Sequence, residues 1–281
     1  MPLLLNESDI RACLDMPLLI DAMSGALAEF SAGRVTQPVR TVLDVGAEKN
    51  YFGVMPASID SRAAVGMKVV TVYHGNHAKG LTSHQATILL LDHATGALAA
   101  LLDGRYITEA RTAAVGLHTR TSVSAREASA ATGLPVRACA TAADAARGAD
   151  LIVTTTASKT PILNDEDVAD GAHICAVGAC RPDQREMATA LVVRARLFVD
   201  SRAAALKEAG EVLLPISEGA ITTDHIVGEL GDIINGKAAG RANERQVTIF
   251  KSLGMAVEDV IAAQLAVARA QTLGLGREIS L

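Results

Sequence analysis

Beyond Gly133, short runs rich in β-branched residues alternate with stretches of helical periodicity. The apolar runs are Pro135–Cys139, Leu151–Thr155, His173–Gly178 and Leu197–Asp200. The helical patterns between them are Ala142–Arg147, Asp165–Ala169, Gln184–Arg194 and Ala203–Gly210. Strands that alternate with helices at this spacing are typical of parallel βαβ units. The sequence therefore predicts a doubly wound, Rossmann-like α/β domain in this part of the chain.

The first 115 residues have a different pattern. Strands are predicted at Leu3–Leu5, Val39–Val45, Tyr51–Met55, Ala64–Tyr73, Ala86–Leu91 and Ala97–Asp103. Most of them follow one another through short turns, which favours an antiparallel sheet or a small barrel. Helices are predicted at Asp9–Cys13, at Pro17–Ala32 and from Ile107 onward, with Asn6 or Ser8 as the first N-cap. These helices would cover one face of the sheet.

The C-terminal part returns to the first domain. A last strand, Gln246–Lys251, leads into a long Ala/Val helix, Val257–Ala270, whose apolar face we expect to pack on the N-terminal part. The predicted fold class is therefore α/β, with an outer α+β domain and an inserted Rossmann-like domain. The outer domain comprises residues 1–115 and 254–281, and the inserted domain comprises residues 116–253.

Composition excludes several classes of protein. A net charge of −5 and the absence of basic runs in the sequence argue against a nucleic-acid-binding surface. The four cysteines and seven histidines show no metal-ligand spacing, so we expect no metal site and reduced thiols in a cytoplasm. The opening MPLLLNESDI is too short in apolar length to predict a signal peptide or a membrane span. We expect a soluble, cytoplasmic protein.

Two cations on predicted regular elements suggest a binding site. Lys68 begins a strand motif, GMKVV, and Arg111 lies on the helix that follows Ile107. Arginine offers a planar fork that matches a carboxylate and lysine offers a point charge, so together they suit a small carboxylate ligand. Arg40, in a third predicted element, would join them if it points inward. The competing interpretation is that these are surface charges.

The predicted parallel strands end in small polar residues. Thr154–Thr156 and Gly178–Ala179 stand at carboxyl ends, where open α/β sheets bind ligands. The competing interpretation is that these residues only cap the strands. A glycine-rich G-x-G-x-x-G turn, which would hold a pyrophosphate, does not occur. The only G-x-G, Gly274–Gly276, is too close to the C-terminus to open such a unit, and the segment before Pro135 is too short for one, since a βαβ unit takes about 30 residues.

Five motifs together resemble the ornithine cyclodeaminase/mu-crystallin family. They are KVVT at Lys68–Thr71, RTAAV at Arg111–Val115, AVGACRPDQRE at Ala176–Glu186, VDSRAAALKEAGEVLLP at Val199–Pro215 and TIFKSLGMAVED at Thr248–Asp259. The resemblance implies an outer domain that holds the substrate and forms a homodimer, and an inserted domain that binds NAD or NADP. Members of the family include ornithine cyclodeaminase, alanine dehydrogenase and reductases of cyclic ketimines.

The resemblance also implies roles for particular positions. Arg40, Lys68 and Arg111 correspond to the substrate-carboxylate cage, with Lys68 and Arg111 as catalytic residues. The positions that correspond to nicotinamide-side contacts are Thr112, Thr154, Thr155, Thr156, Val177, Gly178, Lys251 and Ser252. Cys180 aligns with the substrate-contacting position at which the cyclodeaminases carry an aspartate. His84 and His93, near the cage in sequence, are interpreted as strand and turn residues.

One block of the family pattern is missing. Family members continue from the RTAA helix into the first Rossmann strand, a glycine-rich turn, a helix and a second strand. Here Leu117–Thr121 runs directly into Arg126–Gly133, which resembles the helix after that second strand. The inserted domain is therefore expected to lack its first βαβ unit.

The resemblance implies an NAD(P)-dependent reductase of a small imino or ketimine acid. In the expected mechanism, a hydride is transferred to a protonated C=N carbon, the cations anchor the neighbouring carboxylate, and Lys68 delivers a proton. Two alternatives stay open. One is an ornithine cyclodeaminase, which the absence of the aspartate at Cys180 disfavours. The other is a non-catalytic protein that binds a small carboxylate and has lost dinucleotide binding.

Overall fold

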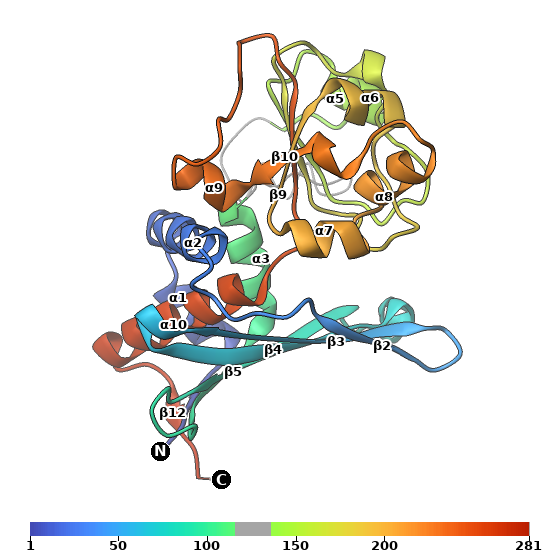
Figure 1. Ribbon diagram of the computed structural model, residues 1–281. Coiled ribbons are helices and arrows are strands. Elements are labelled where there is room, and N and C mark those ends of the chain that lie inside the picture. Colours follow the sequence, from blue (N-terminus) through green and yellow to red (C-terminus); the bar gives the residue numbers. More distant parts are fainter. Residues whose placement is uncertain (116–135, 281) are drawn as a thin grey trace. The chain divides into compact units, whose positions relative to one another are not determined.

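The computed structural model describes residues 1–115 and 136–280, and the chain divides into two compact units (Figure 1). Unit 1 comprises Met1–Val115 and Gly254–Leu281, and unit 2 comprises Gly116–Leu253. Leu117–Thr121, Arg126–Gly133 and Pro135, on which part of the sequence interpretation depends, lie outside the described residues.

Unit 1 contains a seven-stranded sheet in the order β12-β1-β6-β5-β4-β3-β2. Its strands are β1 (Leu3–Leu5), β2 (Thr41–Val45), β3 (Asn50–Ile59), β4 (Ala64–Val72), β5 (His84–Leu91), β6 (Leu98–Asp103) and β12 (Arg277–Glu278). The predicted antiparallel pairing is confirmed for β2 to β6, whereas β1 pairs with β6 in parallel. That pair became possible because β1 and β6 are far apart in the sequence, and parallel neighbours need a long connection.

Four helices of unit 1 pack together and against this sheet. They are α1 (Glu7–Cys13), α2 (Met16–Ser31), α3 (Gly104–Val115) and α10 (Ala256–Leu273). α10 contacts α1, α2, α3 and strands β3 to β5, which confirms the predicted packing of the C-terminal helix on the N-terminal part (Figure 1). Its many alanines allow this close approach, and residues 256–263 are all buried. The helix ends at Gly274, which is left-handed with φ 66° and closes the last turn.

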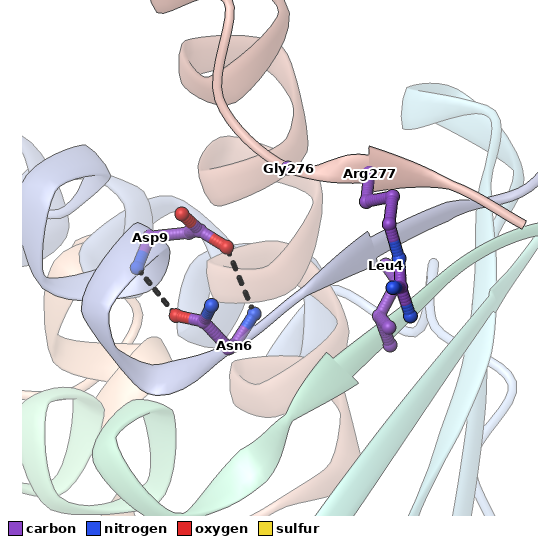
Figure 2. Close-up of a pocket in the computed structure, with 5 residues that line it drawn as sticks. All are labelled: Leu4, Asn6, Asp9, Gly276 and Arg277. Atoms are coloured by element: carbon purple, nitrogen blue, oxygen red, sulfur yellow. Dashed lines mark hydrogen bonds between the residues drawn. The ribbon is translucent and has the colours of Figure 1, made fainter.

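The first helix begins with the predicted cap. The side chain of Asn6 accepts a hydrogen bond from the Asp9 amide at 3.0 Å, and the Asp9 carboxylate accepts one from the Asn6 amide at 3.1 Å (Figure 2). This reciprocal capping box satisfies two amide groups at the helix start. Because Asn6 is the cap, the helix begins at Glu7, two positions before the predicted start at Asp9.

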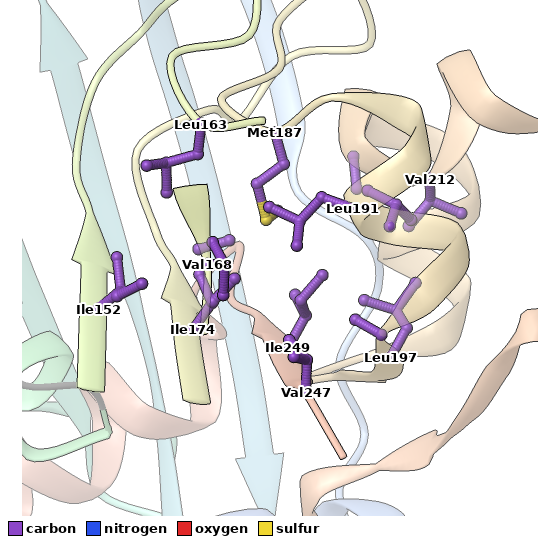
Figure 3. Packing of buried hydrophobic residues seen from close by; sticks show 14 of the residues in the cluster. Ile152, Leu163, Val168, Ile174, Met187, Leu191, Leu197, Val212, Val247 and Ile249 are labelled. Carbon is purple, nitrogen blue, oxygen red and sulfur yellow. The ribbon is translucent and has the colours of Figure 1, made fainter. Parts of the chain in front are cut away.

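Unit 2 contains a five-stranded parallel sheet in the order β10-β9-β11-β8-β7. Its strands are β7 (Leu151–Thr154), β8 (His173–Ala176), β9 (Arg196–Val199), β10 (Ile226–Glu229) and β11 (Thr248–Lys251). Among the described residues of this unit, the helices are α5 (Ala142–Ala146), α6 (Thr189–Arg194), α7 (Arg202–Glu208), α8 (Gly210–Ser217) and α9 (Leu230–Ile234). Ile174, Leu197 and Ile249 from three adjacent strands share one core (Figure 3). The Rossmann-like α/β prediction is confirmed.

One edge of this sheet differs from the prediction. Residues 136–139, the described part of the expected strand Pro135–Cys139, form no strand, so that prediction is wrong for them. β7 is the edge strand among the described residues, and its first residue, Leu151, is 42% exposed. A strand needs a hydrogen-bonded neighbour to be stable, and residues 136–139 have none in the sheet. The sequence also did not predict β10, because Ile226–Glu229 reads IVGE and has only two apolar β-branched residues before a glycine and a glutamate.

Candidate active site

Lys68 and Arg111 are buried side by side in unit 1. Lys68 lies in the middle of β4 and is 2% exposed, and Arg111 lies on α3 and is 4% exposed. Nζ of Lys68 also lies 3.5 Å from Oγ1 of Thr108, one turn earlier on α3. The interpretation of these cations as surface charges is therefore wrong. Burial of two cations is costly unless carboxylates or ligands face them.

Two acidic residues at the start of α10 face these cations. Oδ2 of Asp259 lies 2.7 Å from Nζ of Lys68, and Oδ1 accepts a hydrogen bond from Nε of Arg111 at 2.9 Å. Oε2 of Glu258 accepts one from Nη1 of Arg111 at 2.7 Å. Both acids are fully buried. Sequence reasoning missed them, although an Asp/Glu pair in the first turn of an otherwise apolar helix was the available signal.

Arg40 approaches the same cluster through Gly254. Its Nη2 donates a hydrogen bond to the Gly254 carbonyl at 2.8 Å. Gly254 has φ 77°, and a methyl group on it would lie 2.7 Å from Nη1 of Arg111. The turn before α10 therefore passes between the two guanidinium groups, and only glycine allows this approach. The structure thus brings together the three cations that the sequence nominated.

The cluster shifts the acidity of its members. Burial, aided by the charges of Arg111 and Arg40 and opposed by Asp259, lowers the pKa of Lys68 to about 8. Burial acts to raise the pKa of Asp259, but Arg111 and Lys68 outweigh it, so that pKa lies below its usual range. Asp259 is therefore ionised at neutral pH, and Lys68 is cationic but able to give up a proton near physiological pH.

His84 on β5 lies within reach of these charges. Burial, together with the positive charges of Lys68 and Arg111, lowers its pKa to about 4. The ring is therefore neutral at physiological pH and provides one donor and one acceptor nitrogen. His93 lies elsewhere: its Nε2 is 3.1 Å from the exposed carboxylate of Asp60, beyond the end of β5. It belongs to the turn after β5, as the sequence suggested.

The cluster retains donors that a ligand can use. Lys68 and Arg111 face the carboxylates of Glu258 and Asp259, and Arg40 reaches the same place through the Gly254 carbonyl. Arg111 and Lys68 retain donors beyond those that Glu258 and Asp259 use. The arrangement is thus suited to a small carboxylate.

In unit 2, one buried glutamate ties two strand ends together. Glu186 is fully buried and accepts hydrogen bonds from Oγ1 of Thr154 at 2.8 Å and from the Gly178 amide at 3.1 Å. The Thr156 amide also donates to it. A methyl group on Gly178 would lie 2.1 Å from the Thr156 nitrogen, so the segments after β7 and β8 are in backbone contact. Sequence reasoning named the strand ends but not Glu186.

The other predicted cofactor positions differ in their surroundings. Lys251 and Ser252 are buried: Lys251 donates to the Ala176 carbonyl at 3.1 Å, and Oγ of Ser252 lies 3.4 Å from Asp200. Nζ of Lys251 is also 3.6 Å from Glu211, a carboxyl group whose pKa burial raises. The remaining cofactor positions, Thr112, Thr155, Thr156, Val177 and Gly178, are half-buried, and so is the predicted substrate position Cys180.

These surroundings fit one end of a nicotinamide cofactor. Thr155, Thr156 and Val177 lie at the carboxyl ends of parallel strands, where doubly wound sheets bind nucleotides. They offer hydroxyl and apolar contacts for a planar ring. No glycine-rich turn for the pyrophosphate occurs in the sequence, so the chain's residues fit the nicotinamide end and do not provide the usual phosphate cradle.

Other features do not contribute to this site. A cavity of about 410 Å³ is lined by Leu4, Asn6, Asp9, Gly276 and Arg277, where β1 meets β12 (Figure 2). Asn6 and Asp9 are already paired in the capping box, and none of the predicted site residues lines this cavity. In residues 1–115 and 136–280, no group of three His, Cys, Asp or Glu residues could hold a metal ion. Within the same described ranges, no helix is long and apolar enough to cross a membrane.

Comparison with known proteins identifies the family. The model of the ornithine cyclodeaminase/mu-crystallin family matches residues 2–120 and 117–273. This chain belongs to that family. The two matched segments meet at residues 117–120, where the sequence analysis locates the missing block.

Two relatives of this chain carry the names of imine reductases. Ketimine reductase mu-crystallin of Mus musculus is 38% identical over 309 residues, covering 94% of this chain and 96% of the relative. Delta(1)-pyrroline-2-carboxylate reductase of Bacillus thuringiensis is 32% identical, covering 99% of both proteins. Because 309 exceeds the 281 residues of the chain, the first alignment includes residues of the relative that have no counterpart here.

Solved structures of the family have the same fold. The Delta(1)-pyrroline-2-carboxylate reductase of Thermococcus litoralis, in complex with NADH and L-proline, matches with a TM-score of 0.93 and 30% identity over 99% of this chain and all of the other. An archaeal alanine dehydrogenase dimer with bound NAD matches with a TM-score of 0.90 and 25% identity over all of this chain and 99% of the other.

Proposed function

We propose that this protein is an NAD(P)-dependent reductase of a small imino acid, of the cyclic ketimine type. The observation that carries the proposal is the burial of Lys68 and Arg111 side by side, with the half-buried Arg40 next to them at Gly254. Lys68 and Arg111 have more donors than Glu258 and Asp259 use, and these donors suit a small carboxylate. The relatives named as ketimine and pyrroline-2-carboxylate reductases act on substrates of this kind by their names.

The unit 1 residues have distinct roles in this proposal. Arg111 and Arg40 bind the substrate carboxylate, and Lys68 contacts it as a point charge. Lys68 also delivers a proton to the imine nitrogen, because a lysine with a pKa of about 8 is both protonated and acidic enough at neutral pH. Bound NADH or NADPH supplies the hydride. Much of the rate then comes from fixing the orientation of the substrate.

The unit 2 residues serve the nicotinamide in this proposal. Thr155, Thr156 and Val177 provide the contacts, and Glu186 holds the two strand ends that carry them. Thr112, Thr154, Gly178, Lys251 and Ser252 retain the same predicted role. The buried side chains of Thr154, Lys251 and Ser252 would act by supporting the backbone around the ring.

Reduction is favoured over cyclodeamination by the residue at position 180. Cys180 is half-buried, and its Sγ donates a hydrogen bond to the Val177 carbonyl at 3.5 Å. A thiol in that contact offers no carboxylate to accept a proton from a substrate amine, which deamination of ornithine needs. We retain Cys180 as a substrate-contacting position.

The test is reduction of Δ1-pyrroline-2-carboxylate by purified protein of verified mass, followed by the loss of NADH or NADPH absorbance. We expect saturable turnover with one or both cofactors and formation of proline. Turnover of ornithine to proline and ammonia, without reduction of the imine, would assign the cyclodeaminase alternative instead.

A second candidate function is binding without catalysis. It is supported by the missing glycine-rich turn, because cofactor affinity depends on the phosphate contacts. Binding of a small carboxylate to unit 1, with no binding of NADH or NADPH at millimolar concentration, would favour this candidate.

We propose a homodimer for the assembly. β2 is an edge strand of the unit 1 sheet, four of its five residues are exposed, and Leu43 is 54% exposed. An exposed edge with apolar side chains is a surface for pairing with another chain. The archaeal alanine dehydrogenase is named as a dimer. Light scattering after size exclusion would measure the mass, and Leu43→Lys should shift it towards the monomer.

We also propose a cytoplasmic location. Cys13, Cys139, Cys175 and Cys180 are all unpaired, which suits a reducing compartment. Fractionation of the source cells, followed by detection of the chain, tests this.

A further inference from the structure

We propose that Asp259 is a positioning residue: it fixes Lys68 and Arg111 at the distance from each other that lets both bind the carboxylate of one ligand. The inference rests on the proposed function for the identity of the ligand. Its basis is a bridge: one oxygen of Asp259 is 2.7 Å from Nζ of Lys68, and the other accepts from Nε of Arg111 at 2.9 Å. These two cations come from different elements, a strand and a helix, so the bridge sets the distance between them.

Glu258, the neighbour of Asp259, has a different role. Its carboxylate accepts hydrogen bonds from Nη1 of Arg111 at 2.7 Å and from the Met255 amide at 3.3 Å. It thus holds Arg111 against the start of α10, whereas Asp259 is the carboxylate that raises the pKa of Lys68. The two buried carboxylates lie in one helical turn and form a matched pair for experiment.

The position of Asp259 keeps its carboxylate charged. It lies in the first turn of the eighteen-residue helix α10, where the partial positive charge of the helix end favours an anion. Arg111 and Lys68 add to this and outweigh the cost of complete burial. An aspartate side chain is short and has few rotamers. Because this carboxylate is charged and held in place, its position fixes the positions of both cations.

The bridge also controls the acidity of Lys68. The charged groups around Lys68 are Asp259 on α10, Arg111 on α3, Arg40 before β2 and, when protonated, His84 on β5. Asp259 acts to raise the pKa of Lys68, and both arginines lower it. Without the Asp259 charge, the remaining charged neighbours of Lys68 in this set are cationic. The pKa of Lys68 must then fall further below its present position.

The test compares Asp259→Asn with the matched control Glu258→Gln. In protein labelled with ¹³C on lysine, the chemical shift of Lys68 is followed with pH, and Lys68→Met assigns the signal. We expect Asp259→Asn to lower the pKa of Lys68 by about one unit or more. We expect Glu258→Gln to leave it near the wild-type value. Equal shifts in the two variants, or none in Asp259→Asn, would overturn the proposal.

Binding of pyrrole-2-carboxylate, a planar carboxylate that accepts no hydride, provides a second measurement. Asp259→Asn should weaken it about tenfold or more, because asparagine carries no charge and has only one oxygen, so its NH2 group must face either Lys68 or Arg111. Asp259→Glu keeps the negative charge but displaces it. We therefore expect the pKa of Lys68 to stay near its wild-type value while binding of pyrrole-2-carboxylate weakens. This variant also keeps the proposal testable if Asp259→Asn does not fold, and unchanged binding in it would contradict positioning.

These measurements need no turnover. If Asp259→Asn lowers the pKa of Lys68 as expected but the wild-type protein reduces no imine, the proposed function is refuted and the role of Asp259 stands. If the wild-type protein reduces the imine but Asp259→Asn leaves the pKa of Lys68 unchanged, the role of Asp259 is refuted and the proposed function stands.

Discussion

The α-carbon of Gly254 lies against the guanidinium group of Arg111: a methyl group added there would be 2.7 Å from Nη1 and 2.8 Å from Nη2. The same glycine accepts a hydrogen bond from Arg40 through its carbonyl. Gly254 therefore fixes two of the cluster's cations at once, at the point where the chain enters α10.

Gly254→Ala should weaken both folding and carboxylate binding. Gly33→Ala is the matched control, because Gly33 has φ 74° with nothing within 4 Å of an added methyl group, whereas Gly254 has φ 77° and meets Arg111. The shared cost of the left-handed backbone is about 1 kcal/mol. We expect a larger loss of unfolding free energy in Gly254→Ala, with at least tenfold weaker binding of pyrrole-2-carboxylate. Identical behaviour of the two variants in urea titrations would contradict the contact with Arg111.

Arg111→Gln should destabilise the protein strongly. It removes the guanidinium group that pairs with the buried carboxylates of both Glu258 and Asp259, and removing one partner of a buried ion pair costs about 3–5 kcal/mol. Arg34→Gln is the control, since Arg34 is 54% exposed and pairs with Glu29 at the surface. Exposed pairs contribute about 1 kcal/mol or less. Urea unfolding measures both, and losses of similar size would argue against a buried network.

Lys68→Met should abolish most of the reductase activity. It removes the proposed proton donor and one of the carboxylate contacts, and general acid catalysis alone contributes about 10²–10⁴-fold. The control is Lys159→Met, because the Lys159 side chain is 70% exposed and pairs with Asp183 on the surface. Steady-state kinetics and thermal melting are measured on both. Activity of Lys68→Met within tenfold of wild type would rule out both roles of Lys68.

Acid should destabilise the fold partly through His84. Its folded pKa of about 4 lies below the ordinary value of 6.5, so the unfolded state binds more protons between these limits. Stability from this residue is therefore complete above pH 6.5 and is lost as the pH falls towards 4, at no more than about 1.4 kcal/mol per pH unit. His84→Gln should unfold with a weaker pH dependence than wild type in this window. An unchanged dependence would mean that His84 titrates normally in the folded protein.

Cofactor binding should depend little on the adenosine half. Without a glycine-rich turn in the sequence, we expect NADH and reduced nicotinamide mononucleotide to bind within about tenfold of each other, a difference of about 1.4 kcal/mol. Fluorescence titration of the reduced nicotinamide measures both affinities. NADH binding more than a hundredfold tighter would show that another part of the chain holds the pyrophosphate.

Much of the fold follows from local patterns. The alternation in β3 and β4, the cap at Asn6 and the βαβ spacing from Leu151 to Lys251 are local signals, and the structure has the corresponding elements. The edge of the unit 2 sheet could not be predicted in this way. Residues 136–139 begin with a β-branched valine and were predicted to form a strand, but strand formation depends on a neighbour that the local sequence does not contain.

For the site, the sequence nominated three cations, and the tertiary structure decided which groups they contact. Lys68 and Arg111 lie in motifs of the family, Arg40 was nominated by resemblance, and cations of this kind suit a carboxylate ligand. Only the fold reveals that Glu258 and Asp259, nearly 150 residues beyond Arg111 in the chain, occupy part of their hydrogen-bonding capacity. The physical reason is that the energies of buried charges depend on distances of a few ångströms between side chains. Packing of α10 against α3 and β4 sets those distances.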